Sequence, residues 1–187
     1  DGEVGHLLYA LAERMGKEFG VKSSRQSRTN VNILRLFHQA KMEVSLSNGC
    51  LENTATPRRV RRIVDKIAGQ MVIVLVQALI HYLRTDDERD RVRIYAHAFV
   101  PLVAGCSPRT FEYLKARLLE SDYREVDVDA IIASIRTTLP CFGLSCEDIG
   151  IHSSESEEDC VNPSAVKSIA GYMPNSDVRE FAKLDLD

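Results

Sequence analysis

The sequence contains no tryptophan, and only 6% of its 187 residues are aromatic. So few rings argue against a surface that binds by stacking on nucleobases or sugars. The longest apolar run, from Met71 to Leu83, spans 13 residues and includes Gln77 and His81. A membrane-crossing helix needs a longer run than this. We therefore expect a buried central helix here and no membrane span.

Sequence signatures of catalysis and cofactor binding are also lacking. The chain has no glycine-rich phosphate loop, no nucleophile elbow and no HExxH motif. It has no usable glycosylation sequon, because Pro163 interrupts the one that begins at Asn162. A net charge of −3 gives no general attraction to nucleic acid. We expect no catalytic residues and no cofactor, and binding rather than turnover.

What the sequence does contain is helical periodicity. Apolar residues recur every three or four positions in several segments, and no segment alternates in the manner of a strand. The pairs Thr56-Pro57 and Ser107-Pro108 have the composition of helix starts. These patterns predict an all-α fold with helices over residues 3–19, 31–46, 57–84, 90–105 and 108–118. A further helix starts at Asp127 or Asp129 and runs through Leu139.

Three cysteines recur at similar intervals. Cys50, Cys106 and Cys160 are 56 and 54 residues apart, and a proline follows each within seven residues. Residues 64–71 match residues 166–173 at five positions, and a weaker similarity relates 99–106 to 138–146. Regular spacing of this kind is typical of repeat proteins. We expect helical hairpin repeats, two-helix units of about 50 residues, packed as an irregular bundle or short solenoid.

The repeat divides the chain into four parts. They are an N-terminal hairpin unit (1–50), a central double unit (51–150) with a buried helix over 57–84, an acidic linker (151–161) and the start of a further unit (162–187). The last part resembles only the first half of a unit, and the first residues already have a helical pattern. We expect a processed product or a fragment of a longer repetitive protein.

The cysteines are candidates for disulfide bonds. Cys141 and Cys146 flank a short loop that contains Gly143 and can close a bridge, and the others lie where they can join neighbouring hairpins. With an odd number, one thiol is left for another chain. The alternative is an intracellular protein with unpaired buried thiols. The five candidates are Cys50, Cys106, Cys141, Cys146 and Cys160.

The same region contains a weak set of zinc ligands, Cys141, Cys146, His152 and Cys160. Thiolate and imidazole donors suit a tetrahedral zinc site. However, four, five and seven intervening residues match none of the tight zinc knuckles. We therefore predict no metal and favour disulfides or structural thiols.

Clusters of opposite charge lie far apart in the sequence. The positive cluster, at the start of the helix over 57–84, and the negative cluster, in the linker, are candidates for interaction. Nucleic acid would bind such arginines through its phosphates, but the positive cluster is short and has no aromatic neighbours. We favour pairing with the acids of a neighbouring unit. The residues are Arg58, Arg59, Arg61, Arg62, Glu155, Glu157, Glu158 and Asp159.

Three functions are compatible with these features. The favoured one is a structural or adhesive helical-repeat protein, extracellular or secreted, whose partners are itself or neighbouring repeats of a longer chain. The alternative is an intracellular (cytoplasmic) helical module that binds protein or nucleic acid. The third is an enzyme or a carrier of a small ligand. The number of free thiols separates the first two, since an oxidising compartment leaves at most one of the five free.

Overall fold

The computed structural model describes residues 8–23, 26–46, 55–85, 89–120 and 127–155. Across these ranges the chain is mostly helical, which confirms the prediction of an all-α fold. Strand structure in the described residues is limited to β1 (Lys22–Ser23) and β2 (Gln26–Ser27), which pair antiparallel between the first two helices.

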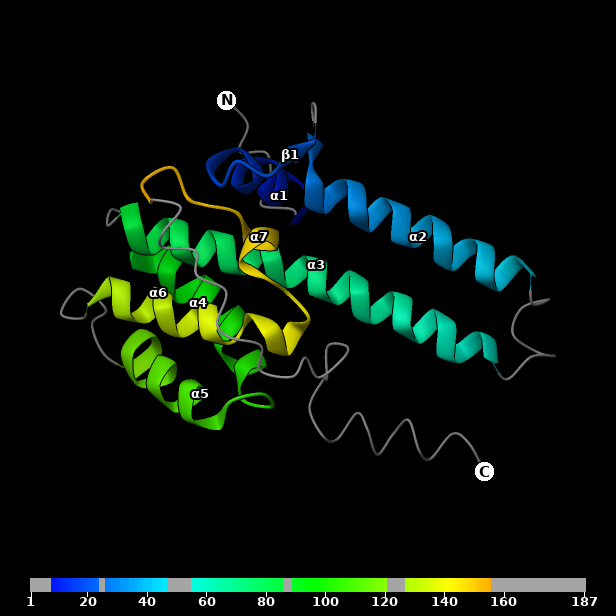
Figure 1. Cartoon of the computed structure of the whole chain (residues 1–187). Helices are drawn as coiled ribbons and strands as arrows, with labels where there is room; N and C mark the ends of the chain where they lie inside the picture. The colour runs from blue at the N-terminus through cyan, green and yellow to red at the C-terminus, as the bar shows by residue number, and fades with distance from the viewer. Residues whose placement is uncertain (1–7, 24–25, 47–54, 86–88, 121–126, 156–187) are drawn as a thin grey trace.

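One long helix, α3 (Ala55–Thr85), organises the fold. Nearly every residue from 72 to 83 is buried. Around this half of α3 pack α1 (Leu8–Glu18), α4 (Arg89–Val103), α6 (Val128–Thr137) and the short α7 (Cys146–Ile149) (Figure 1). We use the term body for α1, residues 72–85 of α3 and the described residues from 89 to 155.

Local sequence signals explain where the later elements begin. Helix α5 (Pro108–Lys115) starts after Ser107, whose hydroxyl accepts a hydrogen bond from the backbone N–H of Thr110, with Pro108 in the first turn. This is the start predicted from Ser107-Pro108. A π-helical turn, η2 (Ala116–Glu120), extends α5, and a 3₁₀ turn, η4 (Leu139–Phe142), follows α6.

The body has one continuous hydrophobic core. It unites buried side chains from α1, α3, α4, α5, α6 and the turns around α7. Tyr82 on α3 stacks on Tyr95 of α4, with ring centroids 5.4 Å apart. The largest fully buried side chains include Met15, Phe19, Leu79, Tyr82 and Phe99. A core of this size is the main source of stability for the body.

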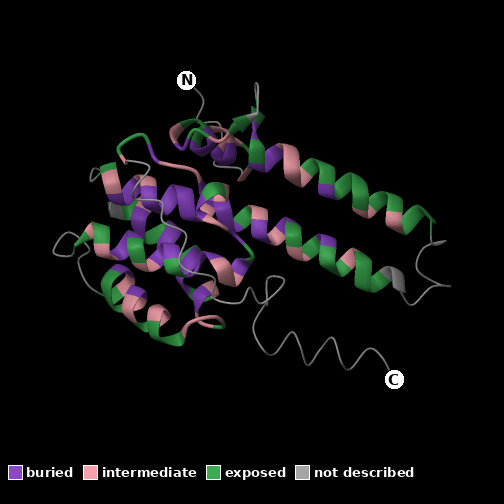
Figure 2. Cartoon of the chain, viewed as in Figure 1, coloured by how far each residue is buried: buried purple, intermediate pink, exposed green. Residues whose placement is uncertain are grey.

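The second region is a two-helix projection. Helix α2 (Arg28–Leu46) lies beside the first half of α3, and the pair extends away from the body (Figure 1). We call α2 and residues 57–71 of α3 the arm. Among the described residues, its separate core consists of Leu36, Ile63 and Ile67, with Ile33 and Ala40 packed against them. Most of the arm surface is exposed (Figure 2), so the predicted buried helix over 57–84 is buried only in its second half.

The structure does not confirm the repeat arrangement. Residues 99–106 form the end of α4 and the turn after it, whereas residues 138–146 form the 3₁₀ turn η4 and the start of α7. Their sequence similarity therefore does not reflect a shared local structure. The further predicted unit over 162–187 lies outside the described residues, as does the copy of residues 64–71.

Residues Pro57–Thr85 form a helix that is long and apolar enough to cross a membrane, judged by length and composition. Most of its apolar window is buried inside the protein. The core helix of a globular protein passes the same test, so this single helix is weak evidence for a membrane span.

Candidate functional site

Exposed apolar side chains gather on the arm. Of the nine large hydrophobic side chains that are exposed in the described residues, seven belong to the arm. Leu34 and Phe37 each keep 55% of their surface in contact with solvent. A concentration of apolar surface on one projection is typical of an interaction site, whereas scattered single residues would have no such meaning.

Helical spacing shows which of these side chains lie on the same side of their helix. On α2, residues 34, 37, 41 and 44 follow one another at intervals of three or four, so Leu34, Phe37, Lys41 and Val44 share one side. On α3, Val64 and Met71 are seven residues apart and share one side in the same way. Each helix therefore presents an apolar stripe beside the contact with its neighbour.

The two stripes lie on the same face of the arm. The helices run antiparallel, because Asn32 donates to Gln70 over 3.2 Å and Arg59 pairs with Glu43 over 3.4 Å. Helical geometry puts both of these contacts on the opposite side from the stripes. We define the apolar face as Leu34, Phe37, Val44, Val64 and Met71, with Lys41 as its one charged neighbour on α2.

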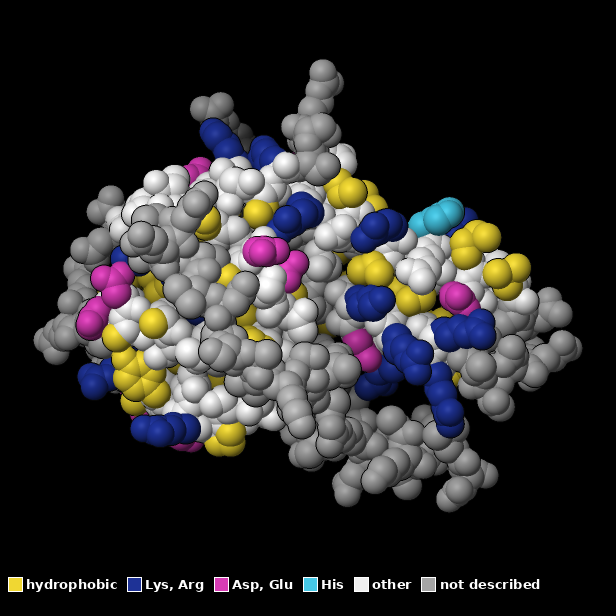
Figure 3. Space-filling view, in the orientation of Figure 1, with side chains coloured by type: hydrophobic (Ala, Val, Ile, Leu, Met, Phe, Trp, Pro, Cys, Tyr) yellow, Lys and Arg dark blue, Asp and Glu magenta, His cyan; other side chains and the backbone are white. Residues whose placement is uncertain are grey.

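The opposite side of the arm is basic. Lys and Arg side chains spread over the arm in Figure 3, together with exposed apolar side chains near its tip. From helical spacing, Arg35, Met42 and Leu46 share this side of α2, and Arg59 and Arg62 share it on α3. Seven basic and two acidic residues lie in 31–46 and 57–71, although the whole chain is acidic, so positive charge is concentrated on the arm.

The predicted arginine cluster is where the sequence suggested, at the exposed start of α3. Arg58, Arg59, Arg61 and Arg62 are all exposed. Arg61 pairs with Asp65 one turn later over 3.5 Å, as expected for a solvated helix face. The predicted acidic partners Glu157, Glu158 and Asp159 lie outside the described residues.

Glu155 was predicted to be an interaction residue in a linker, but its side chain is buried in the structure. Its carboxylate is buried and pairs with Arg84 over 3.1 Å and Arg136 over 2.6 Å, and Arg84 also pairs with Asp129. Because residues 151–155 pack on the body, the first part of the predicted linker is not a free spacer. A buried carboxylate requires such partners, since an unpaired charge in a core is strongly destabilising.

A second polar group lies one turn before Arg84. His81 Nδ1 is 3.0 Å from His152 Nε2, and His152 Nδ1 is 2.7 Å from the hydroxyl of Ser154. The side chain of Glu18 completes the group, with its carboxylate and one nitrogen of each imidazole all within 4.8 Å of one another. Burial lowers the pKa of His152 below its usual 6.5, although Glu155 and Glu18 oppose this. His152 is therefore neutral near pH 7.

Backbone contacts hold the segment that carries His152. The N–H of Ile151 donates to the carbonyl of Phe19, and the N–H of Ser153 donates to the carbonyl of Glu18. The chain reaches this position through Gly150, at φ 80°, where a Cβ would collide with the carbonyl oxygen of Phe19. We call residues 150–155 the strap, because they fasten to the C-terminal end of α1.

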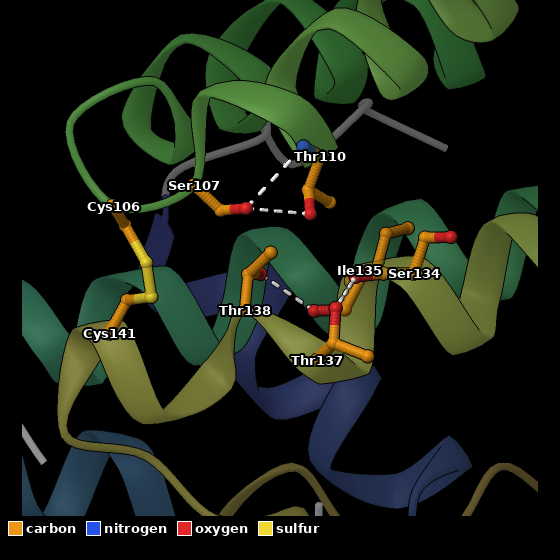
Figure 4. The surroundings of a disulfide bond; sticks show 8 residues. All are labelled: Cys106, Ser107, Thr110, Ser134, Ile135, Thr137, Thr138 and Cys141. Carbon is orange, nitrogen blue, oxygen red and sulfur yellow. Dashed lines mark hydrogen bonds between the residues drawn. A yellow bond between two sulfur atoms is a disulfide. The ribbon is translucent and has the colours of Figure 1, made fainter. Parts of the chain in front are cut away.

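A disulfide bond joins Cys106, just after α4, to Cys141 in η4 (Figure 4). The two Cα atoms are 5.8 Å apart, within the usual range for a bridge. Cys141 is thus bonded to Cys106 and not to Cys146, and it has no thiolate to offer the predicted weak zinc set. Cys146 is also disulfide-bonded. Cys50 and Cys160 lie outside the described residues.

Sequence reasoning missed the histidine cluster, because Glu18, His81 and His152 lie 63 and 71 residues apart. A partial signal was present in α3. Gln77, His81 and Arg84 interrupt an apolar run at intervals of four and three residues, which places them on one side of a helix. A polar stripe on a buried helix requires partners elsewhere in the fold. Gln77 finds one in the carbonyl of Ile149, at 2.6 Å.

Comparison with known proteins returned no relative: no family model matches the chain, and no curated protein or solved structure matches it. Functional inference therefore depends on the apolar face, the strap and the cluster of Glu18, His81 and His152.

Proposed function

We propose that the protein assembles with copies of itself through the apolar face of the arm, as a structural or adhesive protein does. The observation that supports this is the apolar face itself, with exposed side chains from two helices on one side of a projection. Exposed apolar surface has an unfavourable hydration free energy, which contact with a partner removes.

A second copy suits this surface better than an unrelated partner does. The face consists of two antiparallel helices with apolar residues at intervals of three and four, and two such faces can pack as an antiparallel four-helix arrangement. A two-fold axis would pair the patch with itself. The basic side of each arm would then face outward, so its positive charges would not be brought together at the interface.

The disulfide between Cys106 and Cys141 supports an oxidising location, because such bonds persist outside the cytosol. An extracellular setting is therefore part of the proposal. In that setting, self-association through a projecting arm gives ordered contact between copies and requires no catalytic turnover.

Sedimentation velocity on the full chain, at a series of micromolar concentrations, tests the proposal. We expect a reversible dimer, and we expect Phe37→Glu to weaken dimerisation by at least about tenfold, because it buries an unpaired charge at the interface. Met42→Glu is the matched control. Met42 is an exposed apolar residue on the same helix but on the basic side, so its change should leave the dimer intact.

A substitution at Lys41 should change the dimer affinity in the opposite direction. It lies within the apolar stripe of α2, where a second copy would have to accommodate its charge. Lys41→Leu should therefore strengthen the dimer. A wild-type chain that stays monomeric throughout the concentration series would exclude self-association. If Phe37→Glu and Met42→Glu weakened dimerisation equally, the apolar face would be excluded as the interface.

A further inference from the structure

We propose that Glu18, His81 and His152 form a binding site for one Zn²⁺ ion. One carboxylate oxygen and two imidazole nitrogens lie within 4.8 Å of one another, and the two nitrogens are already 3.0 Å apart. Donor atoms on a tetrahedral zinc ion lie roughly 3.3 Å from each other, given Zn–N bonds of about 2.0–2.1 Å. Side-chain rotation that brings the longer separations, of up to 4.8 Å, to this value would complete the set.

The donor types select the metal. Two imidazoles with one carboxylate suit zinc and similar transition metals, whereas Ca²⁺ and Mg²⁺ require oxygen ligands. Three protein ligands leave the fourth position of a tetrahedron for water or another ligand. Glu18 and His81 are half-buried, so solvent can reach the site, while His152 lies deeper.

The protein holds these ligands in position from three separate segments. Glu18 ends α1, His81 lies in the rigid second half of α3, and His152 is fixed by the two backbone hydrogen bonds of the strap. The Phe19 ring packs edge-on against the imidazole of His152, with centroids 5.1 Å apart. Ligands held in this way lose little conformational freedom when the metal binds.

The second shell is suited to a metal-bound imidazole. Ser154 contacts His152 Nδ1 twice, through its hydroxyl at 2.7 Å and through its backbone N–H, which donates over 3.3 Å. A metal ion on Nε2 would require the ring proton on Nδ1, where the hydroxyl can accept it. Hydrogen bonds of this kind orient metal-bound histidines and raise their basicity.

Two carboxylates near the cluster favour a cation and one arginine opposes it, since, apart from the lowering by burial, Glu155 and Glu18 raise the pKa of His152 and Arg84 lowers it. The two arginines next to the cluster, Arg84 and Arg136, are neutralised by Glu155 and Asp129. A Zn²⁺ ion bound here would connect the strap to α1 and α3. It would raise the stability of the chain by an amount that grows with the logarithm of the free zinc concentration above the Kd.

Isothermal titration calorimetry with ZnCl₂ tests the site on the full chain, oxidised and first freed of metal by a chelator. We expect one ion per chain, and a rise in thermal midpoint with zinc that Ca²⁺ and Mg²⁺ do not produce. His81→Ala and the nearly isosteric Glu18→Gln should each weaken zinc binding by at least about tenfold. Glu18→Gln keeps the test valid if His81→Ala fails to fold.

His38→Ala and His97→Ala are the matched controls, because both histidines are exposed and lie outside the cluster. They should leave zinc affinity unchanged. The proposal is overturned if the wild-type chain binds no zinc, or if binding survives both His81→Ala and Glu18→Gln. Loss of binding in either control would also overturn it, since the ion would then lie elsewhere.

Discussion

The body and the arm share one helix and differ in almost every other respect. Four other helices, α1, α4, α6 and α7, pack around the second half of α3, which carries Arg84, a partner of the buried carboxylate of Glu155. Among the described residues, the first half packs mainly on α2 around a core of three buried residues, and it touches the body where Gly69 lies against Phe142. The same helix is therefore a core element at one end and a surface element at the other.

We infer that the body determines most of the stability and that the arm is the region suited to binding. Residues in the body are held by many buried contacts, so local opening there should approach global unfolding. The arm has few buried contacts and much exposed apolar surface, which is typical of regions that bind partners. We infer that substitutions in the body change mainly stability and that substitutions on the apolar face change mainly association.

Leu→Ala substitutions in the two cores give the largest expected effect. Leu79→Ala in the body should lower the free energy of unfolding by about 3–5 kcal/mol, because the close-packed surroundings leave a cavity. Leu36→Ala in the arm should cost about 1–2 kcal/mol, since a three-residue core can collapse or open locally. Urea denaturation followed by circular dichroism measures both, and equal losses would remove the distinction between the two regions.

Removal of the disulfide should affect only the body. The double variant Cys106→Ser with Cys141→Ser opens a loop with a sequence separation of 35, which corresponds to about 2–4 kcal/mol of stability. Hydrogen exchange should then accelerate in α4 and α6 but not in the arm, whose contacts do not involve either cysteine. Faster exchange throughout α2 would show that the two regions unfold together.

Ion pairs in the body and in the arm allow the stability of the two regions to be compared directly. Glu155→Ala leaves Arg84 and Arg136 without their buried partner, and we expect a loss of about 2 kcal/mol because both arginines keep some access to water. Glu43→Ala breaks the exposed pair with Arg59 on the arm and should cost less than about 1 kcal/mol. Thermal unfolding by calorimetry compares the two, and a larger loss from Glu43→Ala would contradict the assignment.

The smallest expected effect concerns the apolar face. Phe37→Ser should change the free energy of unfolding of the monomer by no more than about 0.5 kcal/mol, because more than half of the side chain is already exposed. Measured at concentrations below those of any dimer, a loss comparable to that of Leu36→Ala would place Phe37 in the arm core instead.

Local signals allowed part of the fold to be predicted from sequence. The apolar run after Met71 and the pairs Thr56-Pro57 and Ser107-Pro108 depend on neighbours within a few turns, and the structure has helices there. Burial was not predictable in the same way. The periodicity of α3 continues through both halves, but only tertiary packing determines that, in the described part of the chain, the first half packs mainly on α2.

The candidate sites show the same limit. The arginines at the start of α3 were identified because they are adjacent in sequence. Glu155 was predicted to be a linker residue because it lies in an acidic stretch of the sequence. Its partners Arg84 on α3 and Arg136 on α6 are far from it in the chain, so the sequence did not indicate that its carboxylate is buried. The histidine cluster depends on Gly150 and on the backbone contacts of the strap, and no pattern in the sequence indicates which residues a strap will meet.

Because α3 continues without a break from the arm into the body, it can act as a lever. Its outer half, residues 57–71, extends about 22 Å at 1.5 Å per residue. A force applied at the tip by a bound copy would produce a bending moment at the point where α3 enters the body. Gly69 lies there, against the carbonyl of Phe142, which directly follows Cys141 in the turn η4. Mechanical strain on an assembled arm would thus be borne by a cross-linked part of the body.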